Sequence, residues 1–156
     1  MDSEFLTLPG SRVSIEAATW RDLNHLRQLE RACFPKDAWP LLDLIGVLTM
    51  PNVVRLKAMS DHQMVGFIAG DVRKSENTAW IATVGVIPEF RRQGIGKELL
   101  RSLESRLEVG KICLNVRVSN GAAVKLYEEF GYTLAGMWTR YYEDGEDALL
   151  MEKICE

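Results

Sequence analysis

The stretch Arg91-Arg92-Gln93-Gly94-Ile95-Gly96-Lys97 decides the fold of this chain. It follows an apolar, strand-like run from Ala79 to Ile87 and precedes a run whose apolar residues recur every four positions, at Ile95, Leu99, Leu103 and Leu107. We therefore expect a strand, a glycine-bearing turn and the start of a helix. The first N–H groups of a helix are unpaired and lie at the positive end of its dipole, so this turn is suited to bind an anion. Gly94 and Gly96 would let a pyrophosphate approach the backbone.

Spacing separates three nucleotide-binding motifs that share this design. A phosphate-binding loop of the ATPase kind needs glycine and Ser or Thr where this chain has Arg91 and Glu98. A dinucleotide fingerprint needs a third glycine at the position of Leu99. Both are excluded. The remaining pattern, Arg-x-x-Gly-x-Gly between a strand and a helix, resembles the acetyl-CoA pyrophosphate loop of the GNAT acetyltransferase superfamily. The alternative is an ordinary strand-to-helix turn with solvated basic flanks.

Length and composition fit a single enzyme-sized domain. The chain has 156 residues, of which 47% are hydrophobic, so it can bury a full core but is short for two domains. We expect one domain over residues 13–156, preceded by a loose arm over residues 1–12. The net charge of −3 argues against a general nucleic-acid binder.

Cysteine usage and hydropathy indicate the compartment. Cys33, Cys113 and Cys155 are odd in number and contain no Cys-x-x-Cys pair, so neither a disulfide framework nor a zinc site is predicted, and no metal is expected. No apolar run approaches the length of a membrane span. A cytoplasmic protein without a membrane partner is therefore expected.

The pattern along the chain predicts a strand, two helices, three strands, a helix, a strand, a helix and two strands. Strands are expected at residues 13–15, 53–59, 64–72, 79–87, 111–117, 132–138 and 147–154. The first helix starts at a capping box of Thr19 and Asp22, and the last is capped by Ser119 and ends at Gly131. This order resembles the GNAT fold, an α/β (α+β) fold with a mixed central sheet of about seven strands flanked by about four helices.

Two further segments extend the resemblance over nearly all of the chain from Val13 onward. The run from Leu114 to Ala123 with Leu126-Tyr127-Glu128, and the run Tyr141-Tyr142-Glu143-Asp144-Gly145-Glu146-Asp147-Ala148, resemble protein Nα-acetyltransferases. These are the bacterial RimI-type ribosomal-protein acetyltransferases and their archaeal and eukaryotic relatives. The resemblance implies that acetyl is transferred from acetyl-CoA to the N-terminal α-amine of a protein or peptide, with a ribosomal protein as one candidate.

The resemblance also implies where acetyl-CoA would bind. Acetyl transfer passes through a tetrahedral oxyanion that needs backbone N–H donors, and in GNAT folds the strand before the pyrophosphate loop leaves such donors free. That role maps to Val84, Gly85 and Val86, with the pantetheine arm along the strand. The pyrophosphate would be held by Arg92, Gln93, Gly94, Ile95, Gly96 and Lys97. Asn120 matches the family's cofactor-contacting asparagine, although an asparagine there would also serve as a helix cap.

Tyr127 and Asn115 are the expected catalytic residues. In the family, the tyrosine of Leu-Tyr-Glu is the general acid for the departing thiolate, and a phenol with a pKa of about 10 is protonated at neutral pH. The alternative for Tyr127 is a core aromatic. RimI-type enzymes carry a glutamate where this chain has Asn115, and because an amide accepts no proton, Asn115 is expected to orient a water.

The acceptor amine decides how much a weak base matters. Deprotonating an α-amine with a pKa of about 8 at pH 7 costs on the order of 1 kcal/mol, whereas a lysine costs about 4.6 kcal/mol. We expect Phe34, Pro35, Asp37, Tyr141 and Tyr142 to bind the substrate, or else to be solvated loop residues. A GNAT enzyme for a small-molecule amine or lysine, and a non-catalytic acetyl-CoA-binding module, remain alternatives. The sequence is consistent with a monomer or weak dimer.

Overall fold

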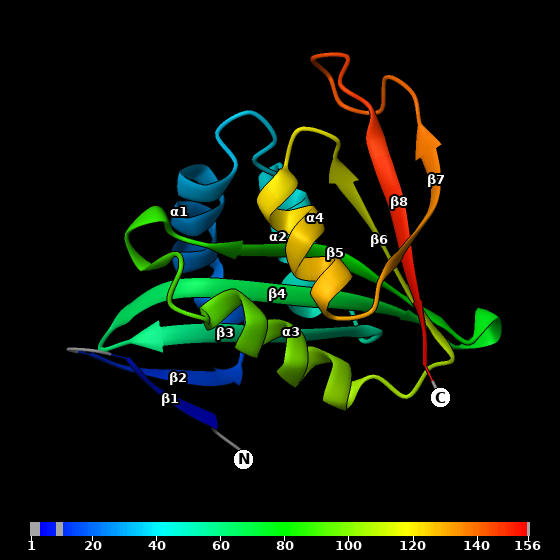
Figure 1. The fold of residues 1–156 in the computed structure, drawn as a ribbon. Coiled ribbons are helices and arrows are strands. Elements are labelled where there is room, and N and C mark those ends of the chain that lie inside the picture. Colours follow the sequence, from blue (N-terminus) through cyan, green and yellow to red (C-terminus); the bar gives the residue numbers. More distant parts are fainter. Residues whose placement is uncertain (1–3, 9–10, 156) are drawn as a thin grey trace. The chain divides into compact units, whose positions relative to one another are not determined.

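The computed structural model describes residues 4–8 and 11–155, which form eight strands, four α-helices and three short 3₁₀ helices (Figure 1). They divide into two compact units. The first unit contains the chain up to Asp71 and the segment Ala82–Leu107, and the second contains Val72–Ile81 and Glu108 onward. Strand β5 (Thr78–Val86) therefore contributes its first four residues to the second unit and the rest to the first.

The first unit is built on antiparallel strands. Their hydrogen-bonded order is β1-β2-β3-β4-β5. Besides β5, the strands are β1 (Glu4–Leu8), β2 (Ser11–Ala17), β3 (Val53–Ser60) and β4 (Gln63–Arg73). The turn between β3 and β4 uses a left-handed residue, Asp61, with φ of 53°. Long strands arise here because residues 53–73 are rich in β-branched and apolar side chains.

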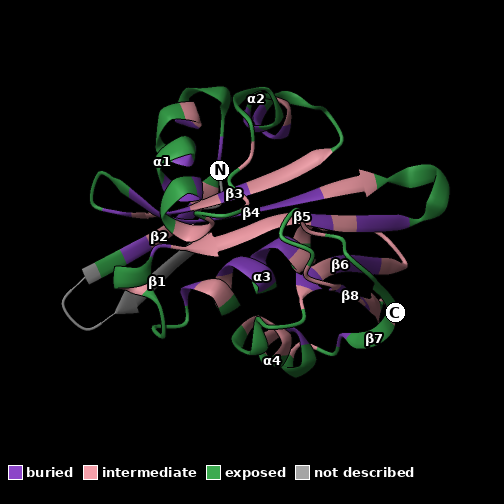
Figure 2. Ribbon diagram, turned by 90° about the horizontal axis from the view of Figure 1, so that it is seen from above, coloured by how far each residue is buried: buried purple, intermediate pink, exposed green. Residues whose placement is uncertain are grey.

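Three helices cover the strands of the first unit, namely α1 (Leu23–Cys33), α2 (Leu41–Thr49) and α3 (Ile95–Arg106). Figure 2 shows α1 and α2 on one side of these strands and α3 on the other. Glycine at position 66 of β4 allows α3 to pack closely on this strand, because a Cβ there would lie 2.9 Å from Leu99 Cδ1. The capping box is confirmed: Thr19 and Asp22 cap the 3₁₀ turn Trp20–Asp22 that leads directly into α1.

The second unit is a smaller mixed arrangement with strand order β5-β6-β8-β7. Its elements after β5 are β6 (Lys111–Arg117), α4 (Gly121–Glu129), β7 (Thr133–Trp138) and β8 (Ala148–Ile154). Strand β6 is parallel to the start of β5, from Thr78 paired with Lys111 to Trp80 paired with Cys113, and antiparallel to β8. Gly131, with φ of 92°, ends α4 and turns the chain into β7.

The GNAT-type arrangement of strands and helices is confirmed, with two local differences from the sequence analysis. Residues Glu4–Leu8, assigned above to a loose arm, form a strand paired with β2 from Glu4–Ile15 to Leu8–Ser11. Such a short segment gains its backbone hydrogen bonds from a partner strand, which local patterning does not reveal. Residues 1–3 and 9–10 of that arm lie outside the described residues. Helix α4 is capped by Asn120 rather than Ser119. The single domain over residues 13–156 stays a prediction.

Candidate active site

The turn between β5 and α3 has the backbone geometry of an anion cradle. After the 3₁₀ turn Pro88–Phe90 the chain passes through two left-handed residues, Arg92 with φ of 64° and Gly94 with φ of 87°. A Cβ at Gly94 would meet no heavy atom within 4 Å, so glycine is favoured there by its φ and not by crowding. Gly94 is also the N-cap residue of α3, and its side chain, being hydrogen, caps nothing.

The first turn of α3 begins without hydrogen bonds of its own. The first hydrogen bond of the helix is from the Glu98 N–H to the Gly94 carbonyl at 3.0 Å, so the N–H groups of residues 95–97 have no partner within the helix. Arg91 fixes the base of this turn, since its Nε donates to the Val86 carbonyl at 2.8 Å. Arg92 and Lys97 are exposed, so the turn can hold a phosphate by both backbone and side chains.

The end of α1 packs directly on the part of β5 that precedes this turn. A Cβ at Gly85 would lie 3.1 Å from Cys33 Sγ and 3.2 Å from Phe34 Cε2. Burial raises the pKa of the Cys33 thiol, and a hydrogen bond with Arg91 acts in the opposite direction. Phe34, expected at the substrate, and Gly85, expected at the cofactor, are thus brought together in the first unit.

The chain from Phe34 to Pro40 joins α1 to α2 as expected for a loop. The Asp37 N–H donates to the Phe34 carbonyl at 3.1 Å, which closes a tight turn around Pro35. Asp37 is half-buried, whereas Pro35 is exposed. Their proposed contact with the substrate stays a prediction.

In the second unit, Tyr127 lies on the buried side of α4. It is 5% exposed, and its ring meets that of Tyr132 edge-to-face with centroids 5.7 Å apart. Burial, with a smaller contribution from Tyr142, raises the pKa of the Tyr127 phenol well above its usual value. The phenol is therefore fully protonated at neutral pH, as a proton donor must be, although the packing of Tyr127 equally fits a core aromatic.

Asn115 and Asn120 differ in how far their hydrogen bonds are satisfied. Asn120 Oδ1 accepts the Ala123 N–H at 3.3 Å, so its acceptor caps α4 and only its amide N–H₂ remains to meet a ligand. Asn115, on β6, has a buried Oδ1 with no hydrogen-bond partner among the described residues. Because buried acceptors are nearly always paired in native proteins, this oxygen is suited to a water or an amine.

A clamp that sequence reasoning missed holds the loop between β7 and β8. The Arg117 guanidinium pairs with Asp144 at 2.9 Å and with Glu146 at 2.8 Å, and lies 4.1 Å from the centre of the Tyr142 ring. Glu146 also accepts the Ser119 N–H at 2.8 Å, and hydrogen bonds from Ser119 and Arg117 lower its pKa. Arg117 is 27 residues from Asp144 and 29 residues from Glu146, so no short sequence motif predicts these ion pairs.

The clamp orders the aromatic residues expected at the substrate. Tyr142 contacts the half-exposed Tyr141 edge-to-face at 5.0 Å, and Tyr141 lies 5.3 Å from Trp138. The second unit contains five of the predicted residues, of which Tyr141 and Tyr142 are in contact; the five are Asn115, Asn120, Tyr127, Tyr141 and Tyr142. Among the described residues, no group of three or more His, Cys, Asp or Glu could hold a metal, and no helix is long and apolar enough to cross a membrane.

Sequence reasoning also missed Glu30 on α1. It is buried at 1% exposure, and the Thr83 hydroxyl of β5 donates to its Oε1 at 3.2 Å. The available signal was its position four residues after Leu26, on the apolar face of the helix, where a carboxylate is unusual.

Comparison with known proteins identifies the family. Residues 20–132 match the profile of the Acetyltransferase (GNAT) family. The chain belongs to the GNAT acetyltransferase family. This GNAT chain is 33% identical over 153 residues to the N-alpha-acetyltransferase RimI of Mycobacterium tuberculosis, covering 95% of this chain and 96% of the relative.

Further GNAT relatives agree in sequence and in fold. The [Ribosomal protein bS18]-alanine N-acetyltransferase of Salmonella typhimurium is 36% identical over 104 residues, which cover 63% of this chain and 69% of the relative. The crystal structure of the ribosomal-protein-S18-alanine N-acetyltransferase from Escherichia coli superposes with a TM-score of 0.83 at 28% identity, covering 91% of this chain and 93% of that one. The GNAT fold and an N-acetyltransferase activity follow for this chain.

Proposed function

We propose that this GNAT enzyme transfers acetyl from acetyl-CoA to the N-terminal α-amine of a protein or peptide, with a ribosomal protein as one candidate. The observation that carries the proposal is the turn from Arg91 to Lys97, whose left-handed residues lead into the start of α3, where the first N–H groups make no hydrogen bond within the helix. The similarity to an N-alpha-acetyltransferase over 95% of the chain supports the choice of amine. A cytoplasmic monomer or weak dimer, with no nucleic-acid partner, belongs to the same proposal.

The proposed cofactor residues share one task, which is to hold acetyl-CoA and polarise its thioester. Backbone groups of Val84, Gly85 and Val86 would receive the pantetheine arm and the developing oxyanion. The pyrophosphate would be bound by Arg92, Gln93, Gly94, Ile95, Gly96 and Lys97, with the free amide of Asn120 as a further donor. The open backbone at the start of α3 and the small residue at 85 suit this use.

The remaining residues would handle the protons and the acceptor. Tyr127 donates a proton to the departing thiolate, which its fully protonated phenol permits. Asn115 orients a water or the amine through its unpaired Oδ1. The substrate N-terminus is bordered by Phe34, Pro35, Asp37, Tyr141 and Tyr142.

A comparison of acceptors with matched peptides tests the proposal. Release of free thiol from acetyl-CoA would be measured with a peptide that has a free N-terminus, with the same peptide blocked at the N-terminus but carrying lysine, and with a polyamine. We expect turnover with the first only, because the α-amine is about 3.3 kcal/mol easier to deprotonate than lysine. Equal rates on the blocked peptide would contradict the Nα-assignment. Acetyl-CoA binding without turnover on any amine would favour a non-catalytic module.

A further inference from the structure

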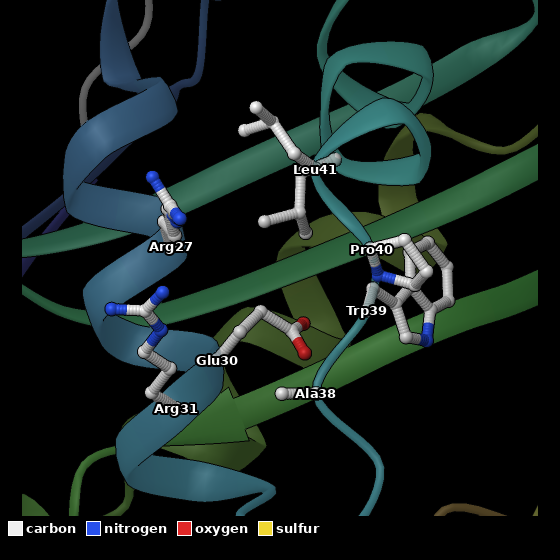
Figure 3. A pocket seen from close by; sticks show the side chains of 8 residues that line it. Arg27, Glu30, Arg31, Ala38, Trp39, Pro40 and Leu41 are labelled. Atoms are coloured by element: carbon white, nitrogen blue, oxygen red, sulfur yellow. The ribbon is translucent and has the colours of Figure 1, made fainter.

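A cavity of about 300 Å³ in the first unit lies between α1, the loop that follows it and the start of α2 (Figure 3). Its lining residues are Arg27, Glu30, Arg31, Ala38, Trp39, Pro40, Leu41 and Leu44. Figure 3 shows the Glu30 carboxylate directed away from the α1 axis toward the segment that carries Ala38 and Trp39. The cavity is otherwise apolar apart from two exposed arginines of α1, so Glu30 is its single carboxylate.

The Glu30 carboxylate is buried without a complete set of partners. Its Oε1 accepts the Thr83 hydroxyl, but its Oε2 has no hydrogen-bond partner among residues 11–155. Burial raises the pKa of Glu30, and the Thr83 hydroxyl and the Trp39 backbone N–H act in the opposite direction. Neither Arg27 nor Arg31 contributes to that shift. An unpaired carboxylate oxygen in an apolar site is costly, so its retention beside a cavity indicates a cationic or proton-donating ligand.

Thr83 links this carboxylate to the part of β5 proposed to hold the thioester. It immediately precedes Val84, Gly85 and Val86, and residues 83 and 85 face the same side of the strand because side chains alternate. Gly85 meets the end of α1 at Cys33 and Phe34, just one turn beyond Glu30. Glu30 and Gly85 therefore lie on the same side of β5, the side that α1 covers.

We propose that Glu30 accepts the proton of the substrate's α-amine, which enters the cavity between α1 and the loop at Trp39. This inference rests on the proposed function and assigns the base that Asn115 cannot supply. The α-ammonium first gives one proton to Glu30. The neutral nitrogen then forms a bond to the acetyl carbonyl carbon, and the carbon–sulfur bond breaks with its electron pair on sulfur. The thiolate takes a proton from Tyr127, the nitrogen loses its second proton to solvent, and Tyr127 regains a proton from solvent, so the products are the amide, free CoA thiol and a protonated Glu30.

Glu30 suits this task by position and by charge. Burial raises the pKa of Glu30, which makes its carboxylate a stronger base than an ordinary glutamate. The groups that face it from other elements, Thr83 on β5, Trp39 in the loop and Leu44 on α2, are uncharged. The two arginines that line the cavity, Arg27 and Arg31, lie on α1 itself and are exposed, so an ammonium that enters the cavity could satisfy Oε2.

The decisive experiment is the pH dependence of kcat/KM for Glu30→Gln, which keeps the shape of the side chain and can still accept from Thr83. With a free-N-terminus peptide, we expect a loss of about 10²-fold or more at pH 7, the usual scale for a general base. The loss should be about tenfold smaller at pH 9, where an amine with a pKa of about 8 is already mostly neutral. Acetyl-CoA affinity, measured by calorimetry, should be unchanged. The exposed Glu108→Gln serves as a control and should match the wild type.

A second variant keeps the test valid if Glu30→Gln folds poorly. Thr83→Val removes the hydrogen bond that lowers the pKa of Glu30, so the acidic limb of the kcat/KM profile should move to higher pH. An equal loss at pH 7 and pH 9 in Glu30→Gln, or an unmoved limb in Thr83→Val, would overturn the assignment while leaving the acetyltransferase function intact. If the wild type acetylates no α-amine, the proposed function fails first and the role of Glu30 falls with it.

Discussion

Replacing Gly85 with alanine tests the close packing of α1 on β5. The added Cβ would lie 3.1 Å from Cys33 Sγ, 3.2 Å from Phe34 Cε2 and 3.3 Å from Cys33 Cβ. All three distances are shorter than an ordinary contact, so the end of α1 must move by a few tenths of an ångström. Overpacking of this kind costs about 1–3 kcal/mol, which a gain of about 0.4–1 kcal/mol from the lower entropy of the unfolded chain offsets in part. We expect a net loss of about 1–2 kcal/mol.

Thermal unfolding and acetyl-CoA titration would measure this effect. For a chain of this size, the expected loss lowers Tm by about 2–8 °C. Gly46→Ala is a suitable control, because a Cβ at that position of α2 meets nothing within 4 Å and the change should instead stabilise the helix by about 1 kcal/mol. Acetyl-CoA should also bind Gly85→Ala more weakly, since the end of α1 moves against the strand proposed to hold pantetheine.

A double-mutant cycle separates the contact from a general effect on β5. Cys33→Ala removes the nearest atom, so the cost of Gly85→Ala should fall by at least about 0.5 kcal/mol in that background. Some of the cost should remain, because Phe34 Cε2 would still lie 3.2 Å from the added Cβ. If Gly85→Ala instead gains stability as Gly46→Ala does, and the two changes at Gly85 and Cys33 are additive, the packing argument is refuted.

Three further predictions concern the cofactor turn, the proton donor and the clamp. Gly94→Glu should abolish acetyl-CoA binding in calorimetry while the protein stays folded, because it adds a side chain and a negative charge at a left-handed position. Tyr127→Phe should preserve acetyl-CoA affinity and lower kcat by roughly 10²-fold; near wild-type turnover would return Tyr127 to a core role. The fold lowers the pKa of Glu146, so its ionised carboxylate stabilises the folded loop. This stabilisation is fully present above the usual carboxyl pKa and is lost as the pH falls through the lowered pKa. The KM for the peptide should rise over that acidic range in the wild type. In Arg117→Ala the KM is already raised and should change little with pH. If the two KM profiles run parallel, the clamp does not order the residues that bind the peptide.

Local patterns were sufficient to predict most elements of the fold. The four-residue repeat from Ile95 to Leu103 predicted α3, and the capping box at Thr19 placed the start of the first helical segment. These features are local, because caps and amphipathic spacing act within one or two turns. Strand β1 escaped prediction because its partner, β2, decides whether it forms.

The candidate site was predictable where backbone chemistry repeats a known pattern. The turn at Gly94 was recognised from spacing, and its left-handed geometry agrees with the choice of glycine. The burial of Glu30 and the pairing of Arg117 with Asp144 and Glu146 depend on segments 27–53 residues apart, so the sequence alone could not assign their partners. Asn120 proved to be a cap whose acceptor is occupied, which narrows any cofactor contact to its N–H₂ group.

The division of β5 between two units has a consequence for synthesis of the chain. Every residue of the first unit precedes Glu108, so this unit can close while the rest is still being translated. During that interval Thr78–Trp80 has left the ribosome but its later partners, Lys111–Cys113, have not, which leaves a bare strand edge of the kind that promotes aggregation. A nascent chain that has left the ribosome only as far as about residue 107 should therefore need a chaperone more than the finished protein does, and no contiguous fragment can reproduce the second unit by itself.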